Sequence, residues 1–150
     1  MSKEANLKKL LYGGILIFIF TIVGDVLFFD SLYIIGLDHL GEPLPSLYLT
    51  YFFVYMYVAL YGGSLVIIGY YLFKNNFNNA GKLFTMLGII LAIAAMVLFI
   101  IVAIIDLMLL GAFFLILLVL FVISIGIGLA GILLTISSYS KLLKMIKNSA

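Results

Sequence analysis

The chain has 150 residues, of which 67% are hydrophobic and only 9% are charged. A soluble domain carries about a quarter charged residues, so this chain could not cover a water-facing surface. The composition therefore excludes a soluble globular enzyme, a disordered chain and a nucleic-acid binder, and it predicts an all-α integral membrane protein. With no Cys and a single His, the chain cannot form a disulfide framework, a thiol-ligated cluster or a bis-His haem site.

Four stretches are long and apolar enough to cross a bilayer, since a spanning helix needs about 20 mostly apolar residues. They are predicted over residues 10–33, 47–73, 83–105 and 112–136. Turn-forming or polar segments separate them, namely GLDHLGEPLPS, KNNFNNAGK and the short DLMLLG. We predict a single domain, residues 1–150, with four transmembrane helices in an antiparallel bundle. The short third connection predicts a tight hairpin between the last two spans.

The basic residues predict the orientation of the chain, because cytoplasmic flanks collect Lys and Arg. All eight are lysines, and they lie before the first span, between the second and third, and after the fourth: Lys3, Lys8, Lys9, Lys74, Lys82, Lys141, Lys144 and Lys147. With four spans these places share one side, so we predict a multi-pass protein of the cell membrane with both termini cytoplasmic. The tail SKLLKMIKNSA is interpreted as the last helix emerging along anionic headgroups.

Small residues indicate where helices pack, because helices associate in lipid through close approach and interhelical hydrogen bonds. The candidate contact positions are the small residues of the last and second spans: Ser124, Gly126, Gly128, Ala130, Gly131, Ala59 and Gly63. The favoured interpretation is ordinary packing within the four-helix bundle. The alternative is an interface with another copy or subunit, for which the last span is the best candidate because it has the most small residues.

Asp25 is the charged residue whose position the topology does not explain. It falls inside the first span, where a charge is costly and usually faces protein or water. Thr21 shares its helix face, and Tyr51 and Tyr55 of the second span are predicted to reach the same depth. The favoured interpretation is a buried carboxylate that accepts a hydrogen bond from one of these phenols. The alternative is a proton- or cation-binding site, because burial raises the pKa of an acid.

No catalytic signature accompanies these features, so we predict that the protein is not an enzyme and has no catalytic residue, metal site or cofactor. Asp38, His39 and Glu42 lie close together in the first loop, but their spacing matches no metal motif. We predict a non-catalytic structural or accessory subunit of a larger membrane complex or homo-oligomer. Its expected partners are the lipid bilayer and other membrane subunits or itself, and not nucleic acid. The alternative is a small ion- or proton-coupled transporter or channel that uses Asp25.

Overall fold

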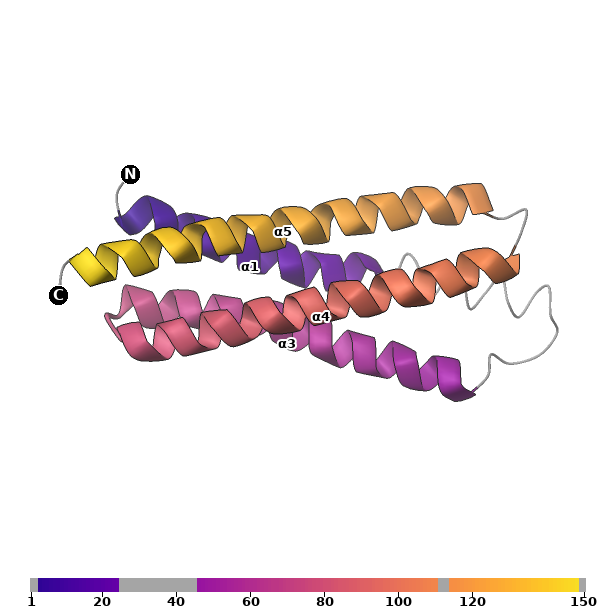
Figure 1. Cartoon of the computed structure of the whole chain (residues 1–150), viewed down its shortest axis with the longest axis horizontal. Helices are drawn as coiled ribbons and strands as arrows, with labels where there is room; N and C mark the ends of the chain where they lie inside the picture. The colour runs from indigo at the N-terminus through magenta and orange to yellow at the C-terminus, as the bar shows by residue number, and fades with distance from the viewer. Residues whose placement is uncertain (1–2, 25–45, 111–113, 149–150) are drawn as a thin grey trace.

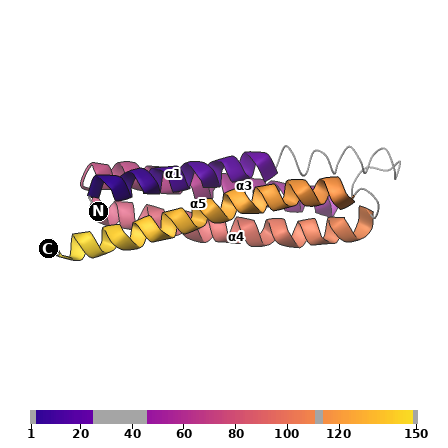
Figure 2. The ribbon, with the colours of Figure 1, turned by 90° about the horizontal axis from the view of Figure 1, so that it is seen from above.

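The computed structural model describes residues 3–24, 46–110 and 114–148, without the side chains of 46–52, 102, 105–110, 114–117 and 120. This part consists of four helices: α1 (Lys3–Val23), α3 (Ser46–Lys74), α4 (Asn78–Leu110) and α5 (Phe114–Asn148). Each contains a stretch long and apolar enough to cross a membrane, with mean hydropathies between 1.6 and 2.9. The predictions of an all-helical chain and of four such helices are thereby confirmed. The helices lie side by side (Figures 1 and 2).

Helices α4 and α5 are longer than the predicted apolar stretches, whereas α3 nearly coincides with residues 47–73. Helix α4 continues past residue 105 to Leu110, and α5 continues past residue 136 to Asn148. Helix α1 begins at Lys3, and the predicted end of the first span at residue 33 lies outside the described residues. The difference arises because a helix can satisfy its backbone hydrogen bonds in water as well as in lipid, so it need not stop where the apolar residues do.

A compact turn joins α3 to α4. Asn76 has a φ of 64°, in the left-handed region that Asn tolerates better than most residues. The amide of Phe77 donates to the Leu72 carbonyl at 2.9 Å, and that of Asn76 donates to the Phe73 carbonyl at 3.2 Å. These two bonds are the Schellman pattern that ends a helix. Lys3 Nζ donates to Asn76 Oδ1 at 3.0 Å, so this turn lies beside the start of α1.

All the lysines lie towards one end of the molecule, where α1 and α4 begin and α3 and α5 end (Figure 1). We call this the lysine end. The side chain of Tyr139 in α5 donates to the carbonyl of Lys82 in α4 at 3.3 Å, which joins two of the lysine-bearing segments directly. The predicted emerging tail is the last part of α5, and it packs against the other helices, since the Leu142 side chain is fully buried.

Each helix packs mainly against two neighbours, in the order α1, α3, α4, α5 and back to α1. The most extensive contacts are between α3 and α4 and between α1 and α5, and among these neighbouring pairs α4 and α5 touch least. A Cβ atom on Gly62 would lie 2.9 Å from the backbone nitrogen of Ala92, so α3 and α4 meet backbone to backbone. Between α4 and α5 the rings of Phe99 and Phe121 intervene. Both α3–α4 and α4–α5 are joined by short segments, so the length of the connection does not explain the difference. The size of the side chains between the helices does.

Candidate functional site

Four aromatic rings, one from each helix, meet inside the described part of the molecule. They are Phe20 of α1, Tyr55 of α3, Phe99 of α4 and Phe121 of α5. The Phe99 ring contacts all the others, with centroid distances of 5.4 Å to Phe20, 5.6 Å to Tyr55 and 5.7 Å to Phe121. Phe20, Tyr55 and Phe99 are at most 1% exposed. Such edge-on and offset contacts are favourable beyond their buried area. We call this set the aromatic layer.

Tyr55 brings α3 against the end of α1, at the residue that precedes Asp25 in the sequence. A Cβ atom on Gly24 would lie 2.5 Å from Tyr55 Oη, so the phenol lies against the backbone of the residue that precedes Asp25. Asp25 itself and the side chain of Tyr51 lie outside the described residues. Thr21 is buried one turn earlier in α1, and its hydroxyl donates to the Ile17 carbonyl at 3.1 Å. Its hydrogen bond is therefore made within its own helix.

Two further buried hydroxyl groups, both in α5, differ in their hydrogen bonds. Thr135 Oγ1 donates to the Gly131 carbonyl at 2.8 Å, the same bond to the preceding turn that Thr21 makes. Ser124 is fully buried, and its Oγ atom has no hydrogen-bond partner among the described residues. A buried hydroxyl without a partner costs free energy. Ser124 lies one turn from Gly128, whose missing side chain makes room for the ring of Phe20 in the aromatic layer.

The predicted contact residues of α5 divide between two opposite faces. Ser124, Gly128 and Gly131 are buried, and a Cβ atom on Gly131 would lie 2.9 Å from the backbone nitrogen of Ile17 in α1. Gly126 and Ala130 are exposed, and a Cβ atom on Gly126 would meet nothing within 4 Å. This division follows from the helical rotation of about 100° per residue, which turns Gly126 by about 200° from Ser124. One small-residue pair thus serves the fold, and the other faces outwards.

The predicted contact residues of α3 both lie inside. Ala59 is fully buried, and a Cβ atom on Gly63 would lie 2.9 Å from the backbone nitrogen of Phe18 in α1. The adjacent Gly62 faces α4, so neighbouring glycines allow α3 to approach two helices at once.

Sequence reasoning missed the aromatic layer and the outward tyrosines of α3. Tyr57 and Tyr61 are 56% and 59% exposed, although both lie in the middle part of α3 and not at an end. In a bilayer, a phenol in the middle of a spanning helix would have no water to bind. The available signal was partial: Tyr55 and Phe121 lie at similar distances from the predicted starts of their spans, whereas Phe20 and Phe99 lie at different distances from the predicted ends of theirs. Which face each one takes could not be read from its spacing.

Of the remaining candidates, the loop residues Asp38, His39 and Glu42 lie outside the described residues. Where the structure is described, it contains no cluster of His, Cys, Asp or Glu that could hold a metal ion. No protein-family model, curated protein or solved structure matches this sequence.

Proposed function

We propose that the protein is a non-catalytic structural component of a membrane assembly, working as a homo-oligomer or as an accessory subunit of a larger complex. In this proposal the four helices form an antiparallel bundle in the cell membrane, with the lysine end cytoplasmic. The observation that carries the proposal is the open face of α5, defined by Gly126, Ala130, Leu133 and Ser137, all of which are exposed. Small residues allow a second helix to approach closely in lipid, where van der Waals packing drives association.

The outward tyrosines of α3 supply a complementary surface at a similar depth. Tyr55 and Phe121 both pack on Phe99, which puts them at about the same level of the bundle. Towards the lysine end, Tyr61 lies about 9 Å beyond Tyr55, and Gly126 lies about 7.5 Å beyond Phe121, at about 1.5 Å per residue. Copies inserted with one orientation would therefore bring Tyr61 of one chain to the level of Gly126 of the next. Tyrosine is enriched at interfaces because it combines a large apolar ring with a hydroxyl.

The close packing of the interior also supports a structural role. At the aromatic layer side chains from all four helices contact one another, and further towards the lysine end the helices meet at their backbones, as Gly131 does with Ile17 and Gly62 with Ala92. A moving substrate would have to separate these contacts.

The test is the mass of the protein after extraction in a gentle detergent, measured by native mass spectrometry. The expected result is a defined oligomer or a fixed stoichiometry with another membrane protein. Replacing Gly126 and Ala130 together by Leu should release monomers, and Tyr61→Leu should weaken the assembly. The matched control is Val97→Leu, which enlarges a half-exposed residue of α4 and should leave the mass unchanged. A wild-type monomer without a co-purifying protein would refute the proposal.

The second candidate is a proton- or ion-coupled transporter that uses Asp25. The observation that favours it is Tyr55, a fully buried phenol that lies against Gly24. A buried phenol beside a membrane carboxylate can stabilise its charge by donating a hydrogen bond. The test is ion or proton flux into proteoliposomes with wild-type protein, Asp25→Asn and Tyr55→Phe. Flux that disappears in Asp25→Asn would support this candidate, and flux equal in all three would exclude it.

A further inference from the structure

Helices α3 and α5 run in the same direction and share one register. Tyr55 of α3 and Phe121 of α5 lie at about the same level, because both rings pack on Phe99. Towards the lysine end the rings of Phe73 and Tyr139 are 6.5 Å apart. This second pair follows the first by the same number of positions in both helices. Residues of α3 and α5 at equal distances from these pairs therefore lie level with each other.

The outward face of α3 carries hydroxyl groups along most of its length. Its residues recur at helical spacing and are exposed, apart from the half-buried serine: Tyr57, Tyr61, Ser64, Ile68 and Tyr71. Tyr57 and Tyr61 lie in the middle of the helix, where a bilayer supplies no water. A phenol cannot reach the carbonyls of its own helix, so these two outward phenols need an acceptor on another molecule.

The open face of α5 has fitting residues at the same levels. In the shared register Ser64 is level with Ala130, where two small side chains allow close approach. Tyr71 is level with Ser137, and both are exposed. A bilayer holds copies inserted with one orientation at one height, because it aligns their apolar stretches. These residues would therefore meet if α3 of one copy lay against α5 of the next.

The middle and the end of this matched stretch also fit. Tyr61 lies within about one position of the level of Gly126. A Cβ atom on Gly126 would meet nothing within 4 Å, so an incoming phenol can reach the backbone of that turn. A helical carbonyl there keeps a second lone pair for it. One turn further towards the lysine end, both helices carry lysines, Lys74 and Lys141, whose like charges end the contact.

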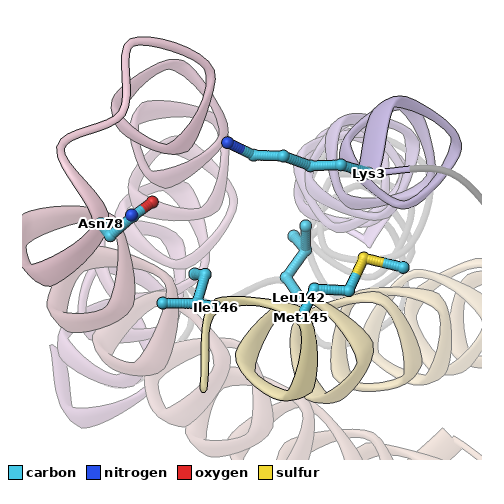
Figure 3. A pocket seen from close by; sticks show the side chains of 5 residues that line it. All are labelled: Lys3, Asn78, Leu142, Met145 and Ile146. Atoms are coloured by element: carbon cyan, nitrogen blue, oxygen red, sulfur yellow. The ribbon is translucent and has the colours of Figure 1, made fainter. Parts of the chain in front are cut away.

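The two faces point in opposite directions. Helices α3 and α5 lie at opposite corners of the bundle, because each packs mainly against α1 and α4 (Figures 1 and 2). Near its end, α5 turns Leu142 and Met145 towards Lys3 of α1 (Figure 3). Ser137 lies about 140° around the helix from Leu142, on the outer side. A contact between two different faces that point apart leaves one face of each kind open after two copies have joined.

We propose that copies of this chain form rows in the membrane, with the outward face of α3 from one copy on the open face of α5 from the next. The inference rests on the proposed structural function and names the partner as a second copy of the chain. In the contact the Tyr71 phenol donates a hydrogen bond to Oγ of the partner's Ser137. The Tyr61 phenol donates to a backbone carbonyl beside the partner's Gly126.

The competing arrangement is a symmetric contact between two α5 helices. It would bring Gly126 against Gly126 and Ala130 against Ala130, which small residues also allow. It would leave the phenols of Tyr57 and Tyr61 facing lipid without an acceptor, at the cost of an unsatisfied polar group. The contact between α3 and α5 covers both faces at once, so it is the arrangement that we favour.

The test is cross-linking between copies, and the absence of native Cys makes it direct. A variant with both Tyr71→Cys and Ser137→Cys is treated in its membrane with a short thiol cross-linker. We expect a ladder of covalent dimers, trimers and larger species on a denaturing gel, because every chain carries one thiol on each face. The two positions lie on opposite outer sides of one chain, so a cross-link between them joins two copies. Either substitution alone should give no ladder.

The matched control moves one thiol to another helix at the same level. Leu83 of α4 is 52% exposed, and the contact of Thr85 with Gly69 puts it at about the level of Tyr71. The variant with both Leu83→Cys and Ser137→Cys should give no ladder. A ladder equal to that of the first pair would mean that the copies collide at random, and it would overturn the inference.

A second measurement removes only the proposed hydrogen bond. Tyr71→Phe should weaken the association of copies about two- to tenfold in native mass spectrometry, as expected for the loss of one hydrogen bond. Tyr12→Phe makes the same change at an exposed tyrosine of α1 and should alter the association less than about twofold. Equal effects of the two variants would count against the bond from Tyr71 to the partner's Ser137.

The outcomes separate this inference from the proposed function. Covalent dimers from Ser137→Cys alone would overturn the inference in favour of the symmetric α5 contact. An assembly that native mass spectrometry detects but that gives no ladder would also overturn it, and the proposed function would stand. A monomer without a co-purifying protein would refute both.

Discussion

Thr135 of α5 occupies the space that a side chain on Gly13 of α1 would need. A Cβ atom on Gly13 would collide with Thr135 Oγ1 and would lie 2.9 Å from the backbone nitrogen of Thr135. The Thr135 hydroxyl is also engaged, since it donates to the Gly131 carbonyl at 2.8 Å. The contact between α1 and α5 at this point is therefore set by backbone atoms, which cannot move aside as a flexible side chain could.

The first prediction is that Gly13→Ala destabilises the protein by about 1–3 kcal/mol, the usual cost of overpacking a close contact. The measurement is thermal unfolding in detergent. The matched control is Val97→Ile, which adds one methyl group to a half-exposed side chain of α4 away from the open face. The control should leave stability unchanged within about 0.5 kcal/mol, as is usual for surface substitutions. Equal destabilisation of the two variants would contradict the close contact.

The second prediction concerns Gly24 and Tyr55. Gly24→Ala should destabilise the protein by about 1–3 kcal/mol, because the added carbon would lie 2.5 Å from Tyr55 Oη. Tyr55→Phe removes that oxygen, so the double variant should be more stable than the sum of the two single effects predicts. A double-mutant cycle in thermal unfolding measures this coupling, which we expect at about 0.5–3 kcal/mol. Purely additive effects would mean that the phenol does not lie against α1.

The third prediction uses the two kinds of buried serine in α5. Ser138 Oγ donates to the Leu134 carbonyl at 2.7 Å, so Ser138→Ala should cost about 0.5–1.5 kcal/mol. Ser124 has no hydrogen-bond partner among the described residues, so Ser124→Ala should be neutral or stabilising. Both are measured by thermal unfolding of the purified protein. A clear loss of stability in Ser124→Ala would instead reveal a partner for that hydroxyl beyond the described part of the chain.

The fourth prediction tests the topology, and the absence of native Cys makes it direct. Single cysteines introduced at Asn76 and Ser140 should react with a membrane-impermeant maleimide only after the cytoplasmic side is opened. A cysteine at Gly41, in the first predicted loop, should react in intact cells. Labelling of Asn76 and Ser140 from opposite sides would contradict the predicted four-span arrangement.

The all-helical class, the four helices long and apolar enough to span a membrane, and the grouping of the lysines along the chain follow from the sequence. These features depend on composition and on position along the chain, because a bilayer selects apolar stretches of a minimum length. The sequence also predicts that small residues such as Gly128 and Gly63 lie at helix contacts, because helices can approach closely only where side chains are small. The helix ends are predicted less well from the sequence, because α4 and α5 continue beyond their apolar stretches.

What only the tertiary structure decided is which residues face each other. Spacing identifies Ser124 and Gly126 as small residues of one helix, but only packing against α1 makes the first buried and leaves the second exposed. The aromatic layer likewise brings together residues from different helices, some far apart in the chain. In lipid the outer faces of helices are as apolar as their contacts, so the hydrophobic pattern that would mark a buried face in a soluble protein is missing here.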